Sequence, residues 1–448
     1  MPARLASNRG RFRTAWIEWV LTLPVAIGLI YCLIHLLLYG YLPPPYFLVA
    51  SDTFMDFFSP ATYAHLGGAY DAYQTIYPPL SFVVLKFLSW GPCYSFNTGV
   101  EARTCDTYGL TSLIIIYLVN CVLIARTFWK IDRSTAIPRT FALCAGLSMT
   151  YALERGNLLL FCFTCVILAY GPLLRSARLR WLFAGLAVNF KIYLIGAIFA
   201  QLLKRRWRWF EGALLATGLV YLASFAILGE GSPSEIYTNI TNYAGGFKVG
   251  DVQYLWYPSS LQPLSLLLSG DALSPIVNLI GSHMVETGLV IINILVAATI
   301  VSVAAAAAAA WLRPAVVSLH RLLMLSMGVA VIYSEVGGYS HMLLLFFVFM
   351  EKWRGLGRGA VLVMAYLLCF PLDYPIAQVP TMVSDSYFAG RIIVTEYTIG
   401  VGIVVRPLLL HLILMILSLV TIRDVWADAR ANGWQSPLPW RRKMEPAS

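Results

Sequence analysis

The run Trp16–Gly40, WIEWVLTLPVAIGLIYCLIHLLLYG, decides the fold class of this chain. Its 25 residues contain one acidic side chain, Glu18, and no Lys or Arg. A helix needs about 20 predominantly apolar residues to cross a hydrocarbon core of about 30 Å. The run is too long for the apolar region of a secretory signal peptide, and no small-residue cleavage site follows it. We therefore interpret it as a membrane-spanning signal anchor.

The composition of the whole chain indicates the same class. Of 448 residues, 59% are hydrophobic and 12% are charged, whereas about a quarter of the residues in a typical soluble domain are charged. We predict an all-α, polytopic integral membrane protein in which residues 1–448 form a single domain with about 10–12 membrane segments. The candidate segments are 15–40, 78–91, 110–128, 141–153, 157–174, 181–203, 209–229, 285–312, 314–334, 341–351, 358–372 and 396–422. Several are short for a full span, so we expect short or re-entrant helices, which are tolerated where they face protein or a wet cavity.

The distribution of basic residues predicts how these segments are oriented across the membrane. Of the 32 Lys and Arg residues, 25 gather in the N-terminal tail and in six short clusters, 126–139, 175–180, 204–208, 313–321, 352–358 and 423–443. The positive-inside rule places such clusters in the cytoplasm. We therefore predict a multi-pass protein of the inner (plasma) membrane with cytoplasmic termini, a cytoplasmic tail at 423–448, and outside loops at 41–77 and 230–284. The clusters also account for the net charge of +10, so no nucleic-acid partner is predicted.

Two segments complicate this orientation. All seven basic groups share one side only if 78–91 and 181–203 each return to the side where they began. If both cross fully instead, residues 92–180 are reversed and seven basic residues lie outside. Lys86 and Lys191 lie in these two segments, and charged residues at membrane depth often mark functional sites.

The eight cysteines are scattered along the chain. Cys93 and Cys105 share one polar loop, and an outside position of that loop would permit a disulfide. The other six lie in apolar runs, where Cys commonly serves as a small packing residue.

Acidic residues gather in the first loop, SDTFMDFFSPATYAHLGGAYDAYQTIYPPL at 51–80, which contains no Lys or Arg. Asp52 and Asp56 are four residues apart and would share a face of a helix. One carboxylate could serve as a general base, and the pair could also hold a divalent ion. The alternative is that both are ordinary solvated loop acids. No cofactor other than this open metal question is predicted.

Isolated cations lie among the apolar segments. Arg155 stands in the turn 154–157 between two apolar runs, where a permanently charged guanidinium favours an anion. Lys191 has about ten residues to either end of its segment, and a lysine near mid-membrane costs at least ~2.5 kcal/mol. Arg391 and Arg406 lie at the outer part of the last segment, and we expect Pro407 to break the helix there.

Together these residues suggest a reaction. Cations around a cavity in the outer half of the bilayer suit a phosphate on a lipid, and an acid suits removal of a proton from a hydroxyl group. The combination describes group transfer from a lipid phosphate at the outer face of the membrane.

The motifs also resemble a known family. The similarity extends over about 45–350 and rests on Asp56-Phe57, Tyr63, Gly67-Gly68, Tyr73, Tyr77-Pro78-Pro79-Leu80, Gly156-Asn157, Phe190-Lys191 with the basic run 204–208, and Ser340-His341. This pattern resembles the polyprenyl-phosphate-sugar-dependent glycosyltransferases of the glycosyltransferase C superfamily, which include bacterial polyprenol-phosphate-mannose-dependent α-mannosyltransferases. Two positions depart from the family pattern: Asn157 stands where Gln is usual, and the Trp of a Ser-Trp-x-His element is missing before His341.

The resemblance implies roles for individual residues. Asp56 would deprotonate the acceptor, with Asp52 in reserve. Lys191, Arg155, Arg406 and Arg391 would bind the donor phosphate, and His341, Asn157 and Tyr77 would bind substrate.

The resemblance also implies a function. The protein would be an inverting membrane glycosyltransferase that moves a hexose, mannose for instance, from a polyprenyl-phosphate donor to a glycolipid or cell-envelope glycan acceptor. The alternatives are a secondary transporter or flippase of lipid-linked sugars, which would be expected to contain internal repeats, and a polymerase or ligase of lipid-linked glycans.

Overall fold

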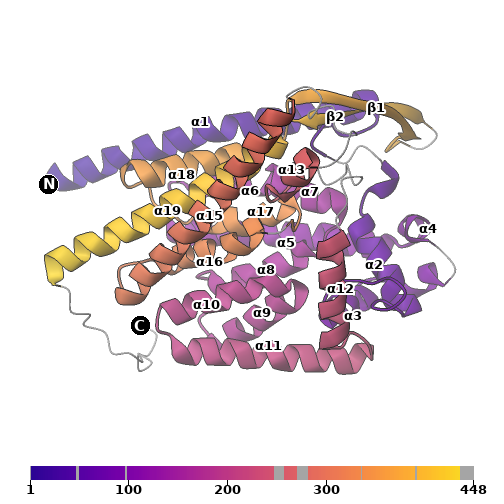
Figure 1. Ribbon diagram of the computed structural model, residues 1–448, viewed down its shortest axis with the longest axis horizontal. Coiled ribbons are helices and arrows are strands. Elements are labelled where there is room, and N and C mark those ends of the chain that lie inside the picture. The colour runs from indigo at the N-terminus through magenta and orange to yellow at the C-terminus, as the bar shows by residue number, and fades with distance from the viewer. Residues whose placement is uncertain are drawn as a thin grey trace.

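The described part of the computed structural model covers residues 2–46, 50–95, 98–246, 257–269, 281–333, 335–388 and 391–433. It is mostly helical, and its long helices run side by side along the longest axis of the molecule (Figure 1). The predicted class, a helical polytopic membrane protein, is confirmed.

Within the described residues, five helices are long and apolar enough to cross a membrane. They are α1 (Pro2–Tyr39), α5 (Thr107–Ile131), α11 (Trp207–Leu228), α15 (Ser282–Leu312) and α19 (Gly402–Asn432). In the first four helices, at most 22% of an apolar 18-residue stretch is buried inside the protein, against 56% of such a stretch in α19. Four of the five therefore present their apolar side chains outward, as lipid-facing helices do, whereas α19 is more internal.

Shorter helices fill the space between these spans. They are α3 (Pro79–Phe87), α6 (Ala136–Cys144), α7 (Leu147–Arg155), α8 (Leu159–Tyr170), α9 (Ala177–Phe190), α10 (Ile195–Leu203), α16 (Leu319–Tyr333), α17 (His341–Val348) and α18 (Gly355–Leu368). Every residue of α17 is buried. The segment predicted at 181–203 breaks at Lys191 into α9, a single 3-10 turn (Ile192–Leu194) and α10. Such broken helices are stable at membrane depth because protein surrounds their ends.

The N-terminus and the described end of α19 lie at one end of the molecule, on the left of Figure 1. Ion pairs and hydrogen bonds join several of the basic clusters there. Arg139 pairs with Glu18 of α1 and donates to the carbonyl of Glu351 at 2.9 Å. Arg321 pairs with Glu351 and, at 3.1 Å, with Asp424. These contacts join 126–139, 313–321, 351–358 and 423–433 into one network.

The two irregular segments both turn back. Arg103, which follows α3, donates three hydrogen bonds to the carbonyls of Ala50, Ser51 and Thr53, which precede it. Residues 175–180 and 204–208 flank the segment 181–203: Arg180 donates to Ala169 O at 2.7 Å and Lys204 donates to Val317 O, both at the basic end. Segments 78–91 and 181–203 therefore return to the end of the molecule where they began.

The two segments predicted as outside loops, 41–77 and 230–284, also contain short elements. Residues 41–77 contain a 3-10 turn at Ala50–Asp52 and the helix α2 (Met55–Leu66), and 230–284 contains α12 (Pro233–Gly246) and α13 (Gln262–Ser269). Residues 247–256 and 270–280 of the second segment lie outside the described part of the chain. A disulfide joins Cys93 to Cys105 at the end of α4 (Gly99–Cys105), as an outside loop permits.

An antiparallel hairpin was not predicted. Strands β1 (Pro375–Asp385) and β2 (Ile392–Gly400) pair with Val383 opposite Val394. The membrane segment predicted from 396 was therefore placed too early, since α19 begins at Gly402. Pro407 does not break α19: it lies in the second turn, where a proline removes one backbone hydrogen bond. The helix also continues to Asn432, ten residues into the predicted tail, and 434–448 lies outside the described residues.

Candidate active site

The two acids of the first loop lie on different elements. Asp52 ends the 3-10 turn and Asp56 lies in the first turn of α2, with Phe54 between them at φ 65°. They therefore do not share one helix face, as their spacing had predicted. Phe54, whose backbone is in the left-handed region, packs against Gly156. A Cβ added to Gly156 would lie 2.9 Å from the Phe54 Cα. Since Gly156 itself has φ +67°, the turn after α7 favours glycine for both conformation and space.

Both carboxylates nevertheless converge on Arg155. Its guanidinium donates to the Asp52 carboxylate and, at 2.8 Å, to Asp56 Oδ1. Asn157 Nδ2 donates to Asp56 Oδ2 at 2.7 Å, and its own Oδ1 accepts from Leu159 N at 2.9 Å, which fixes the amide orientation. The side chains of Asp52, Asp56 and Arg155 are 32%, 21% and 13% exposed, so both acids remain open to a ligand. Figure 1 shows α2 and α7 at the end of the molecule opposite the N-terminus.

We call Asp52, Asp56, Arg155 and Asn157 the acid–arginine cluster. Its positive charge is paired within the protein, which was not predicted from the sequence. Arg155, predicted to bind a donor phosphate, is paired with two carboxylates, so the three charged groups carry a net charge of −1 when ionised. Burial raises the pKa of Asp52 above its ordinary value, although the charge and hydrogen bond of Arg155 lower it. The guanidinium occupies the space between the carboxylates, where a divalent ion had been considered. Among the described residues, no group of three or more His, Cys, Asp or Glu side chains could hold a metal ion.

Lys191 lies beside this cluster. It follows α9 at the break of its segment, and its Nζ is 4.5 Å from the centroid of the Tyr77 ring. It interacts electrostatically with Asp56, and within the described residues no carboxylate pairs with its ammonium group. The structure thus brings together six predicted site residues: Asp52, Asp56, Tyr77, Arg155, Asn157 and Lys191.

His341 and Arg406 form a second group. The Tyr257 hydroxyl lies 2.7 Å from Ser148 Oγ and 3.4 Å from His341 Nδ1. The Arg406 guanidinium is 5.3 Å from the centroid of the Tyr257 ring and pairs with Asp373 at 2.9 Å. Its charge is therefore matched by an acid 33 positions earlier in the chain.

Tyrosine rings connect the two groups. Tyr151 lies edge-on to Tyr257 at 5.2 Å between centroids and stacks with Tyr339 at 6.2 Å. Tyr151 and Tyr339 both interact electrostatically with Asp56. These rings thus link the acid–arginine cluster to Tyr257, which contacts His341.

Glu335 is a buried acid between α16 and α17. Its carboxylate accepts hydrogen bonds from the backbone N–H groups of Ser259, Ser260 and Gly337 at 2.7–3.1 Å, and from both serine hydroxyls. Burial raises the pKa of Glu335, while these donors act in the opposite direction. The carboxylate fixes the segment that carries Tyr257, and Tyr257 in turn contacts His341.

Arg391 is not brought into either group. It immediately precedes β2 with an exposed side chain, and it forms no ion pair among the described residues.

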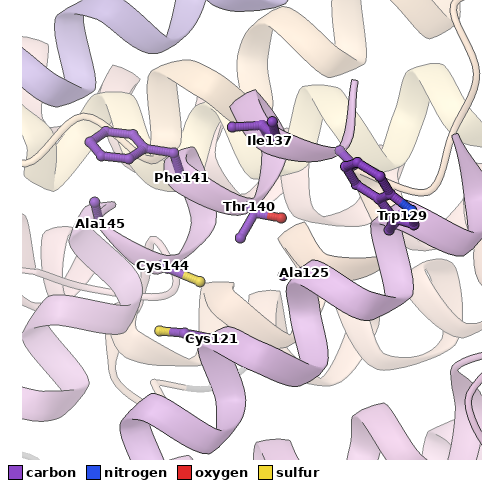
Figure 2. A pocket seen from close by; sticks show the side chains of 9 residues that line it. Cys121, Ala125, Trp129, Ile137, Thr140, Phe141, Cys144 and Ala145 are labelled. Atoms are coloured by element: carbon purple, nitrogen blue, oxygen red, sulfur yellow. The ribbon is translucent and has the colours of Figure 1, made fainter. Parts of the chain in front are cut away.

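A cavity of about 310 Å³ lies beside α5 and α6 (Figure 2). It is lined by residues of α5 and α6 and the turns beside them, namely Cys121, Ala125, Trp129, Ala136, Ile137, Thr140, Phe141, Cys144 and Ala145. Phe57, which follows Asp56, packs against Gly109 at the start of α5. Ala125, which lines the cavity, lies 16 residues further along this helix, a distance of about 24 Å. This cavity contains none of the predicted site residues.

The fold and the comparisons define the class of protein. The long apolar helices, with charged groups clustered beyond their ends, are those of a membrane glycosyltransferase, and the chain belongs to glycosyltransferase family 87, whose model matches residues 75–334. No curated protein and no solved structure matches the chain. The matched range includes Tyr77, Arg155, Asn157 and Lys191, whereas Asp52, Asp56, His341, Arg391 and Arg406 lie outside it.

Proposed function

We propose that this glycosyltransferase moves a hexose, specifically mannose, from a polyprenyl-phosphate donor to a glycolipid or cell-envelope glycan acceptor at the outer face of the inner membrane. The active site would be the acid–arginine cluster together with Tyr77 and Lys191, and the basic end of the molecule would face the cytoplasm, as the positive-inside rule expects. Residues 1–448 would act as one catalytic domain.

The observation that carries this proposal is the unmatched ammonium group of Lys191 beside Asp56. Arg155 is occupied by two carboxylates and Arg406 by Asp373, so among the described candidates Lys191 is the cation available inside the protein. Its ammonium group interacts electrostatically with Asp56 but forms no direct ion pair among the described residues. A buried cation without a direct partner is costly, and a bound anionic ligand would lower that cost. A lipid phosphate enters from the membrane itself, and its charge matches the site.

The reaction follows from these positions. Asp56 accepts the proton of an acceptor hydroxyl, whose oxygen attacks the anomeric carbon. The bond from that carbon to the phosphate oxygen breaks from the opposite face, which inverts the configuration. Lys191 neutralises the polyprenyl phosphate as it leaves, while Arg155 and Asn157 hold the Asp56 carboxylate. Positioning and charge stabilisation supply most of the rate gain in such a site.

The donor can be tested directly with purified wild-type protein in lipid nanodiscs. We expect radiolabel to pass from polyprenyl-phosphate mannose to an extract of envelope glycolipids and glycans, and not from a nucleotide-linked mannose. Transfer from the nucleotide sugar alone would overturn the donor assignment. Transfer from a polyprenyl-phosphate sugar other than mannose would keep the donor class and correct the sugar.

Lys191→Met tests the phosphate site. We expect the KM for the donor to rise about tenfold or more, because a hydrogen bond between charged groups is worth about 1.5–3 kcal/mol and 1.4 kcal/mol corresponds to a factor of ten. Lys191→Arg should restore part of the affinity. Lys86→Met is the matched control, since Lys86 is an exposed lysine of α3. Equal donor KM values for Lys191→Met and Lys86→Met would remove Lys191 from the phosphate site.

A further inference from the structure

Among the described residues, Tyr387, in the turn between β1 and β2, connects the hairpin to the acid–arginine cluster by side-chain hydrogen bonds. Thr53 Oγ1 donates to the Tyr387 hydroxyl at 2.8 Å, and this hydroxyl donates to Glu154 Oε1 at 3.2 Å. Thr53 follows Asp52, and Glu154 precedes Arg155. Tyr387 therefore bridges the two chain segments whose side chains form the cluster.

The same two segments also contact each other directly, at the residues before and after Thr53. Asp52 pairs with Arg155, and Phe54 N donates to Glu154 O at 2.8 Å. Glu154 is 6% exposed, and its Oε2 has no hydrogen-bond partner among the described residues. Without the Tyr387 hydroxyl, both oxygens of this buried carboxyl group would lack a partner, which is unfavourable enough to displace the side chain.

The hairpin is itself anchored, so it can hold Tyr387 in place. Gly40 O, at the end of α1, accepts hydrogen bonds from Tyr387 N and from the Ser386 hydroxyl, both at 2.8 Å. At the base of the hairpin, Asp373 N donates to Pro44 O at 3.2 Å and its carboxylate pairs with Arg406 of α19. Figure 1 shows the hairpin beside the end of α1. Two membrane helices thus fix the position of the Tyr387 side chain.

We infer that Tyr387 is a positioning residue for glycosyl transfer: through Thr53 and Glu154 it holds the Asp52–Asp56 segment in register with Arg155. This inference rests on the proposed function, because it gives the cluster a catalytic role. The hairpin lies beyond the range matched by the family model, residues 75–334.

Tyr387→Phe tests the inference, because it removes one hydroxyl and keeps the ring. We expect kcat to fall by up to about 10²-fold, the size of loss that small misplacements in an active site cause, with the donor KM unchanged. Hydrogen–deuterium exchange of the 50–58 segment should accelerate, since the Phe54 amide is bonded to Glu154. Thr53→Val, which breaks the same bridge at its other end, should act in the same direction.

Tyr374→Phe is the matched control. Tyr374 lies immediately before β1 with a side chain that is 73% exposed, so its hydroxyl should affect neither measurement. Unchanged exchange of 50–58 in Tyr387→Phe would overturn the inference whatever the activity. Faster exchange with wild-type kcat would also overturn it, and the Asp56 variants discussed below then show whether the proposed site fails with it. Exchange needs no donor, so a wrong donor assignment leaves this test decisive.

Discussion

Asp56→Asn is expected to lower the transfer rate by about 10²–10⁴-fold, the contribution typical of a positioned general base. The Asp56 carboxylate is 21% exposed and accepts one hydrogen bond on each oxygen, from Arg155 and from Asn157. Each oxygen keeps a lone pair for the acceptor hydroxyl. The amide of an asparagine cannot take up the proton, so the chemical step should be lost while donor binding remains.

The measurement is a single-turnover transfer assay with polyprenyl-phosphate mannose, together with a thermal unfolding curve for each variant. Asp71→Asn is the matched control, because Asp71 is an exposed acid of the same sequence stretch. Full transfer by Asp56→Asn would exclude Asp56 as the base. Asp52→Asn, whose carboxylate also pairs with Arg155, would then be the next variant to compare.

Arg155→Met is expected to lower transfer by about 10²-fold or more. The substitution leaves two neighbouring carboxylates without their shared counter-ion, and like charges in a partly buried site repel each other and favour protonation. Removing one partner of a fully buried ion pair costs about 3–5 kcal/mol, and the cost here should be smaller because Asp52 is 32% exposed. The loss should therefore appear mainly in kcat, with a modest fall in the melting temperature.

A double variant separates the two roles considered for Arg155. If Arg155 serves to neutralise and orient the acids, Arg155→Met combined with Asp52→Asn removes one charge of each sign, and transfer should recover about tenfold over the single variant. If Arg155 instead binds the donor phosphate, as its sequence position had suggested, the second substitution should give no recovery and the donor KM should rise. The comparison is a double-mutant cycle in the same assay.

Much of the fold follows from local sequence. Runs such as Trp16–Gly40 need only their own length and apolarity to form a membrane helix, because each backbone group bonds within the helix. The charge clusters likewise indicated the shared basic end and predicted that segment 181–203 is not a simple span, whereas its break at Lys191 appears only in the structure. The hairpin at 375–400 was missed, since a short pair of strands gives a weak pattern beside strongly apolar helices.

The sequence alone also identified most residues of the candidate site, since acids and isolated cations are conspicuous in an apolar chain. Their pairing was decided only by the tertiary structure. Arg155 meets Asp52 and Asp56 across 103 and 99 positions, and Tyr387 meets Glu154 across 233. Local propensity carries no information over such separations. Partner choice depends instead on which short helices pack together, and on the cost of leaving a buried charge without a counter-ion.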